Sequence, residues 1–387
     1  VQPTQINGQP RYLLPAHRNS LQKDPLGSRE HFILSSTSLL EWKLESFIPQ
    51  PASGRVFLHE VNIAPWDTRG ELKIVMRTAN YEDTSLTTNP PRAYSSISRD
   101  GGHSWEIISP DLSRNDESKQ ELAGGPITKD NTGVEVYGTI FALEESPHKA
   151  GVLWAGSDDG LIHLSMDGGE NWENVTPRNM PEWGTVNAIA ISPHDPAKAF
   201  AAVHRYRMDD FTPYLFRTDD YGESWDLVTN GRNGIPDDHF VRAVAEDGTR
   251  EGLVYVGTEF GMYVSFDDGD SFEPLQLNLP VTPITHLVFK NDDLVVATQG
   301  RSIWILDDLT PLQQQSDDIQ GADYHLYTPR TTIQFIGGGG NPPAGTPAGR
   351  NPSYGAALYY ELPPGLDEDY DHERNRDDYL DYLNIRY

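Results

Sequence analysis

The chain of 387 residues contains no cysteine. This absence excludes disulfide bonds, thiolate metal sites and a cysteine nucleophile. It fits a periplasmic or extracellular protein that folds without disulfides, and we expect that location, although a cytosolic protein can also lack cysteine. The first residue is Val1 rather than an initiator methionine, which favours a mature chain whose signal peptide has been removed.

Long apolar runs and basic residues are scarce as well. No stretch of about 18 apolar residues occurs, so we expect no membrane-spanning segment, and at most a position peripheral to a membrane. Lys and Arg total 30 against 58 Asp and Glu, which gives a net charge of −28. Such a surface repels phosphates, so we exclude nucleic acid as a partner and favour protein partners with a basic surface.

An eight-residue pattern recurs along the chain, and we call each copy a box. It consists of Ser or Thr, Asp two positions later, Gly two after that, and an aromatic residue three further on. Gly supplies the positive φ of a tight turn, Asp accepts hydrogen bonds from turn amides, and the aromatic ring covers the hairpin. The complete boxes are Ser98, Asp100, Gly102 and Trp105; Ser165, Asp167, Gly169 and Trp172; Thr218, Asp220, Gly222 and Trp225; and Ser265, Asp267, Gly269 and Phe272.

Short β-rich runs flank the boxes. Val152–Gly156, Leu253–Gly257 and Leu294–Thr298 each precede a box or box-like segment, and degenerate copies lie at Ser35–Trp42 and at Asp307. Four short strands in a repeat of about 40 to 50 residues are typical of a propeller blade. The sequence therefore predicts an all-β fold, a β-propeller of six four-stranded blades with extended arms at both ends; five or seven blades are the alternatives.

Four segments follow from this reading. Within the first blade only the last two strands are recognisable, near His31–Ser36 and Leu40–Phe47, and we expect Tyr324–Tyr327 and Thr331–Ile336 to supply the missing partners. The predicted segments are an extended N-terminal arm at 1–30, the propeller with its box hairpins at 31–336, a Gly/Pro linker with a remnant strand at 337–366, and an acidic, Tyr-rich tail at 367–387.

The predicted tail combines eight acidic residues with aromatic ones. Alternating acidic and aromatic side chains suit a segment that orders on a basic and apolar partner, whereas a frayed terminus is the alternative. The candidate partner-binding residues are Tyr370, Tyr379, Tyr382 and Tyr387.

The boxes resemble the Asp-box (BNR) repeats of sialidase-like and sortilin-like propellers. The stretch from Gly138 to Leu312, above all Leu153–Leu161 and Gly300–Leu312, is similar to exported bacterial "glycosyl hydrolase, BNR-repeat" proteins. More loosely, it resembles photosystem II assembly-factor propellers, a resemblance that implies binding to a membrane complex without chemistry. The hydrolase label of the first group rests on repeats and transfers little.

No catalytic motif accompanies the repeats. A sialidase-type site needs clustered arginines with a Tyr and a Glu, and the candidates are scattered: Arg205, Tyr206 and Arg207 in one expanded loop, and Arg242, Arg301 and Arg330 near other strands. Acidic pairs such as Asp158–Asp159 fit turns better than a glycosidase site. His148 and His194 occupy equivalent repeat positions. We therefore predict no catalytic, cofactor-binding or metal-ligating residue, and keep calcium as the one ion that turn carboxylates could hold.

These observations favour a non-catalytic docking or scaffold subunit outside the cytoplasm, such as an extrinsic subunit of a membrane assembly, photosynthetic in one version. The alternative is a carbohydrate-active enzyme or lectin, for example a sialidase-like glycoside hydrolase, in which Trp154, Trp183 or Trp304 would stack on sugars. A third reading is a receptor-like propeller that binds a peptide in its channel.

Overall fold

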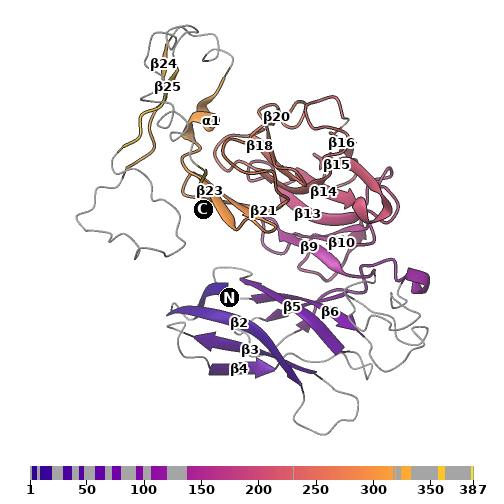
Figure 1. Ribbon diagram of the computed structural model, residues 1–387. Helices are drawn as coiled ribbons and strands as arrows, with labels where there is room; N and C mark the ends of the chain where they lie inside the picture. Colours follow the sequence, from indigo (N-terminus) through magenta and orange to yellow (C-terminus); the bar gives the residue numbers. More distant parts are fainter. Residues whose placement is uncertain are drawn as a thin grey trace. The chain divides into compact units, whose positions relative to one another are not determined.

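The computed structural model consists mainly of β-strands in the part of the chain that it describes, which confirms the all-β prediction (Figure 1). Contacts divide the chain into two compact units: unit 1 holds residues 1–191, 196–199 and 218–225, and unit 2 holds 192–195, 200–217 and 226–387. The described residues are 2–6, 9–19, 29–36, 43–47, 57–65, 72–79, 93–98, 106–119, 137–229, 231–316, 319, 324–332, 356–361 and 385–386; their side chains are described at 34, 43 and 44 and between 108 and 361.

The described strands form six four-stranded sheets, and five of these consist of four consecutive strands. The first two sheets contain β1 (Gln2–Ile6), β2 (Gln9–Asn19), β3 (Arg29–Ser36) and β4 (Lys43–Phe47), then β5 (Phe57–Pro65), β6 (Leu72–Ala79), β7 (Ala93–Ser98) and β8 (Glu106–Ile107). The next two contain β9 (Ile140–Glu145), β10 (Leu153–Ser157), β11 (Ile162–Ser165) and β12 (Glu173–Asn174), then β13 (Thr185–Ile191), β14 (Ala199–Arg205), β15 (Asp210–Thr218) and β16 (Asp226–Leu227). The fifth contains β17 (Val241–Glu246), β18 (Val254–Thr258), β19 (Met262–Ser265) and β20 (Glu273–Pro274), and the sixth β21 (Ile284–Lys290), β22 (Asp293–Thr298), β23 (Ile303–Leu306) and β26 (Ile385–Arg386).

Burial falls from the second strand of a sheet to its last. All residues of β10 and β18 are buried, whereas both residues of β12, β16 and β20 are exposed. First strands pack side by side, β9 with β13 in unit 1 and β17 with β21 in unit 2. Gly156 of β10 and Gly257 of β18 let the first strand of the next sheet approach the second strand as well, because a Cβ there would lie 2.4 Å from Val186 and 2.5 Å from Ile284. The core thus lies between the faces of neighbouring sheets.

The box hairpins join the third and fourth strands of their sheets. In the box of unit 1 that begins at Ser165, the Ser165 hydroxyl donates to Asp167 (2.9 Å) and accepts from the Gly169 amide (2.9 Å). Asp167 also accepts from the Asn171 amide nitrogen (2.9 Å). Gly169 has a φ of 96°, a conformation that costs glycine little. The boxes at Thr218 and Ser265 repeat these bonds.

Each described box also binds the sheet before it in the chain. The Trp172 indole N–H donates to the Ile108 carbonyl (2.9 Å), and the Trp225 indole N–H donates to the Val175 carbonyl (2.7 Å). Both carbonyls directly follow the last strand of the preceding sheet. The aromatic residue therefore links two sheets in addition to covering its own hairpin, which was its predicted role.

The box at Ser265 makes the same link by a different route. Phe272 has no N–H on its ring, and the side-chain amide of Asn233 donates instead to the equivalent carbonyl, that of Val228 (2.8 Å). The Phe272 amide in turn donates to the Asn233 carbonyl (2.7 Å). An asparagine from the connecting segment thus supplies the donor that tryptophan provides elsewhere.

The N-terminal residues correct the predicted arm. Within residues 1–30, β1 and β2 pair with each other, and β2 pairs with β3, so the chain itself completes the first sheet. The prediction that Tyr324–Tyr327 and Thr331–Ile336 supply these strands was wrong. There, β24 (His325–Leu326) pairs with β25 (Tyr360–Glu361) in a separate two-stranded sheet. Prolines at positions 10 and 15 lie within β2 and obscured its pattern.

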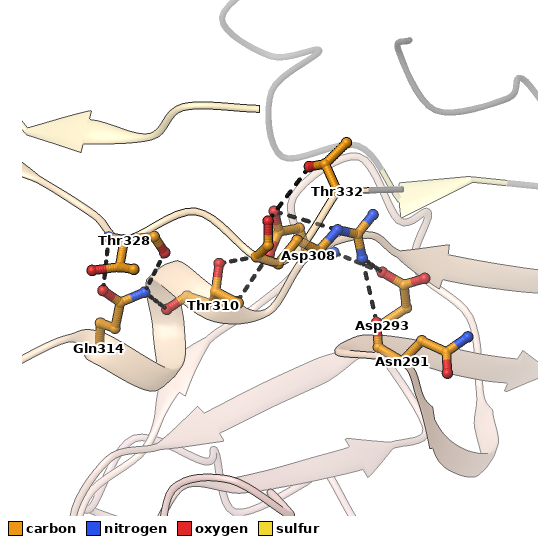
Figure 2. A network of polar contacts seen from close by, with 8 residues as sticks. Asn291, Asp293, Asp308, Thr310, Gln314, Thr328 and Thr332 are labelled. Carbon is orange, nitrogen blue, oxygen red and sulfur yellow. Dashed lines mark hydrogen bonds and ion pairs between the residues drawn. The ribbon is translucent and has the colours of Figure 1, made fainter. Parts of the chain in front are cut away.

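The last box-like segment forms no hairpin. After β23 the chain enters α1 (Thr310–Gln314), and β26 takes the fourth position beside β23. Figure 2 shows how the departing chain is held: Asp293 accepts from Arg330 (2.6 Å) and from the Asp308 amide (2.9 Å). Gln314 of α1 donates to the Thr328 carbonyl (2.9 Å) and accepts from the Thr328 amide (2.9 Å).

The Asn233 link gives a stability prediction. Asn233→Ala removes a hydrogen bond to a carbonyl between sheets, and we expect it to lower the free energy of unfolding by about 1 kcal/mol in urea denaturation. Phe272→Trp in the Asn233→Ala background should restore most of this loss, because its indole N–H reaches the Val228 carbonyl. Phe272→Trp alone should not stabilise. The absence of any rescue would contradict the proposed equivalence of the two donors.

Asp220 gives a pH prediction. The side chain and backbone amide of Ser224 donate to Asp220 and hold its pKa below the ordinary value of 3.8. A lowered pKa contributes stability that is present above about pH 3.8 and is lost as the pH falls through the folded-state value. We expect the difference in unfolding free energy between the wild type and Asp220→Asn to shrink below that pH, with Asp219→Asn as the matched control. An Asp220 pKa at or above 3.8 by NMR would contradict this.

Candidate docking surface

The candidate site lies at the end of the sheets opposite the box hairpins. In an antiparallel four-stranded sheet the turns after the first and third strands lie at one end of the strands, and the turn after the second strand lies at the other end. The boxes follow third strands. The turns Tyr206–Asp209, between β14 and β15, and Glu259–Gly261, between β18 and β19, follow second strands. The end of the sheets opposite the boxes therefore lacks the hydrogen bonds that stabilise the box hairpins.

The hairpin of β14 and β15 is longer than its counterpart in the next sheet. These strands have 7 and 9 residues, against 5 and 4 in β18 and β19. An ion pair between Arg205 and Asp210 (3.2 Å) closes the hairpin, and the Tyr214 hydroxyl donates to Asp210 (2.9 Å). Met208, within the loop that this pair closes, and Phe211, directly after it, are exposed, at 39% and 46%. The extension therefore presents apolar side chains to solvent.

Aromatic rings stack beneath the hairpin. Tyr206 and Phe240 are stacked, with centroids 5.1 Å apart and planes at 16°, and Phe211 lies 6.1 Å from Phe240. The ring of His239, the residue before Phe240, lies 4.6 Å from that of Phe260 and is tilted by 35°, and Phe260 is 40% exposed. We call Tyr206, Arg207, Phe211, Phe240, Arg242, Glu259 and Phe260 the aromatic–arginine surface.

A β-bulge sets the position of Arg242. In the pairing of β17 with β18, Val241 faces Thr258 and Ala243 faces Gly257, so Arg242 has no partner on β18. Such bulges redirect a side chain. The Arg242 guanidinium carbon lies 5.2 Å from the Tyr206 ring centroid and 5.1 Å from that of Phe240. Its Nε donates to Glu259 at 2.5 Å. The arginine is thus held by two rings and one carboxylate.

Arg207 extends the positive charge to the exposed side. Its guanidinium carbon lies 5.6 Å from the Tyr206 ring, and no carboxylate among the described residues forms an ion pair with it. An exposed arginine beside Met208 and Phe211 has the composition that protein interfaces favour, since aromatic residues, Met and Arg are enriched there.

His204 lies buried behind this surface. It is 3% exposed and contacts the rings of Tyr206 and Phe240 at 5.0 and 6.0 Å. Burial, followed by the charges of Arg242 and Arg207, lowers the pKa of His204 to about 3. The imidazole is therefore neutral at physiological pH and acts as a packing group under the surface.

The sequence-predicted residues divide into four groups. The residues that come together are Arg205, Tyr206, Arg207 and Arg242. Arg301 lies in the turn between β22 and β23 of another sheet. Arg330 binds Asp293, at the end of that sheet where the other sheets have their boxes. Trp154 and Trp304 are buried and therefore unavailable to stack on sugars. Asp100, Gly102, Trp105, Tyr370, Tyr379, Tyr382 and Tyr387 lie outside the described residues, and Ser98 ends β7.

Sequence reasoning missed Phe211, Phe240, Glu259 and Phe260. The expanded loop around Tyr206 was a signal, but nothing in the pattern showed which later residues would pack against it. Within the described ranges, no group of three or more His, Asp or Glu side chains is placed to hold a metal ion, and no helix is long and apolar enough to cross a membrane.

Comparisons with known proteins show distant structural similarity to several solved structures. No family model matches it, and no curated protein does. The structure is similar to an ancestral GH74 enzyme (TM-score 0.41, 18% identity, 64% of this chain and 29% of that one). It is also similar to YCF48 from Cyanidioschyzon merolae (0.44, 13%, 72% and 78%) and to YCF48 bound to a D1 peptide (0.41, 12%, 85% and 93%). The chain spans less than a third of that GH74 enzyme, and similarity at this level assigns no activity or partner.

The buried position of His204 gives a prediction. Its imidazole should stay neutral across roughly pH 5 to 8, and Arg242→Ala should raise its pKa because a neighbouring positive charge is removed. NMR titration of the ring protons measures both values, with Arg301→Ala as a control that leaves the pKa unchanged. A wild-type pKa near the ordinary 6.5 would show that His204 is not packed under the aromatic–arginine surface.

Proposed function

We propose that this protein is a non-catalytic docking protein that binds a protein partner through the aromatic–arginine surface. The observation that carries the proposal is that Phe211 and Phe260 are exposed and that Arg207, which lies over the Tyr206 ring, is exposed and has no carboxylate partner among the described residues. Exposed apolar side chains around an arginine are costly in water and favourable in an interface, which supports a surface that is covered when the protein works.

The surroundings of this surface also suggest the partner's character. The chain carries a net charge of −28, so long-range attraction favours a partner with a basic surface, while Arg207 favours a carboxylate at the point of contact. A location outside the cytoplasm, as an extrinsic subunit of a membrane complex, is part of the same proposal. It rests on the absence of cysteine and on the docking surface.

We further propose that the six described four-stranded sheets are blades of a β-propeller. Two features support this: each sheet outside the last is built from consecutive strands, and first strands pack on first strands in both units. In a propeller, first strands lie nearest the axis and box hairpins lie at the rim. The docking surface would then belong to one open face of the ring.

A glycoside hydrolase is less well supported at this surface. Such an enzyme needs a carboxylic acid whose pKa is raised, opposite a second carboxylate. Glu259 is paired with Arg242. Burial alone would raise the pKa of Asp210, but hydrogen bonds from Thr212, Tyr214 and Arg205 bring it below its ordinary value. Both carboxylates therefore hold the hairpin and the arginine in place.

Site-specific photo-crosslinking in the native host tests the proposal. A benzophenone amino acid at position 211 or 260 should crosslink to one defined protein, and the same probe at Leu227, an exposed residue of β16, should not. With the purified partner, Arg207→Ala should weaken binding about tenfold or more, whereas Lys149→Ala, in the exposed turn between β9 and β10 at the box end of its sheet, should leave the dissociation constant unchanged. Equal crosslinking from all three positions, or glycan hydrolysis that Glu259→Gln abolishes, would contradict the proposal.

A further inference from the structure

An exposed apolar face lies on the small sheet of unit 2 formed by β24 and β25, which is separate from the six four-stranded sheets (Figure 1). Leu326 faces Tyr360 across these strands. Side chains two positions apart share a face of a strand, so Tyr324 and Leu358 lie on the same face. All four are between 56% and 65% exposed. We call these two strands, with Tyr324 and Leu358, the C-terminal ribbon. Soluble proteins rarely leave such a face uncovered.

The opposite face of the ribbon is packed and polar. Tyr327 is buried there, and its hydroxyl donates to the Glu361 carboxylate and to Gln315 (3.2 Å), the residue after α1. The side-chain amide of Gln315 also donates to Glu361 (3.2 Å). These bonds hold the two strands against the end of α1, so the apolar face is the one turned away from the helix.

The backbone groups of Leu326 and Tyr360 also point outward. The Tyr327 amide donates to the Tyr359 carbonyl (2.9 Å), which makes these two residues a hydrogen-bonded pair. Hydrogen-bonded and non-hydrogen-bonded pairs alternate along an antiparallel ladder, so the N–H and C=O groups of Leu326 and Tyr360 face the two outer edges. Within the described part of the chain no further strand pairs with either edge. A two-stranded sheet is marginal in water, and a third strand stabilises it.

The sequence on either side of the ribbon is acidic. No Lys or Arg occurs at 302–329 or at 351–373, and the acidic residues there include Asp317, Asp318, Asp323 and Asp367–Asp369. Lys and Arg side chains of a partner are attracted to such surroundings, whereas a second copy of this chain, with its own net charge of −28, is repelled. The occupant that fits the ribbon is therefore a basic segment of a different protein.

We propose that the C-terminal ribbon binds an extended segment of a partner protein in which Lys or Arg alternates with apolar residues. The segment adds as a third strand and pairs with the outward backbone groups of Leu326 or Tyr360. Its apolar side chains stand beside these two residues as cross-strand neighbours, and its cations are attracted by the acidic residues on either side. The ribbon shares no residue with the aromatic–arginine surface, so this site is additional to the docking proposed above.

Fluorescence anisotropy with a labelled peptide tests strand addition. The probe is an octapeptide of four Lys-Val repeats. We expect it to bind the full chain saturably, and about tenfold or more tightly than the same peptide with N-methylated backbone amides, which keeps the charge but cannot pair with a strand edge. A Glu-Val octapeptide should bind more weakly than the probe. Equal affinity for either control peptide, or no saturable binding of the probe, would overturn the proposal.

Substitutions in the exposed face locate the binding site of the peptide. Leu326→Ser and Tyr360→Ser replace exposed side chains, so both variants should fold, which circular dichroism verifies. We expect each to weaken binding of the Lys-Val peptide about tenfold. Met166→Ser changes an exposed apolar residue of a box hairpin in unit 1 and should leave the affinity unchanged. Unchanged affinity in both ribbon variants would place the peptide elsewhere and overturn the proposal.

Photo-crosslinking in the native host identifies the natural occupant. A benzophenone amino acid at position 360 should crosslink to a segment of another protein in which basic and apolar residues alternate. Crosslinking to a second copy of this chain, to a segment without that pattern, or to no protein would overturn the proposal. Failure here leaves the aromatic–arginine surface standing as a docking site, since that is judged by crosslinking at positions 211 and 260.

Discussion

The structure depends on one recurring hydrogen bond between sheets. At each described box, a side-chain N–H donates to the carbonyl that follows the last strand of the preceding sheet. Trp172 donates to Ile108 and Trp225 to Val175, and at the third box Asn233 of the connecting segment donates to Val228. These carbonyls would otherwise lack a partner at a packed contact, where an unsatisfied polar group is costly. The box is therefore a device for joining sheets as much as a turn.

This arrangement leaves the end of the sheets opposite the boxes available for function. Because the boxes join the sheets at one end of the strands, the turns at the other end can vary in length and composition without loosening the contacts between sheets. The hairpin of β14 and β15 uses that freedom by lengthening both strands and exposing Phe211. The bulge at Arg242 then adds a fixed positive charge beside the rings of Tyr206 and Phe240.

Much of the strand order could be predicted from the sequence, because Gly, Asp and aromatic residues at fixed spacing directly encode a hairpin. The β-rich run Leu294–Thr298, predicted to precede a box-like segment, coincides with β22. The last two strands of the first sheet were recognised, but its first two were not, because β2 contains prolines and no box lies in β1 or β2. The aromatic–arginine surface could not be predicted for a different reason, because a bulge such as that at Arg242 arises from strand pairing. The links between sheets could not be predicted either, because the acceptor of a tryptophan N–H is a backbone carbonyl, which any residue supplies.

The central claim is that the aromatic–arginine surface is the part of the protein that a partner covers. Hydrogen–deuterium exchange of the protein, alone and in its isolated complex, measures this most directly. The account predicts slower exchange confined to the segments around Tyr206–Phe211 and His239–Phe260 on complex formation. Protection of the box hairpins at Ser165–Trp172 and Ser265–Phe272, with those two segments unchanged, would contradict it.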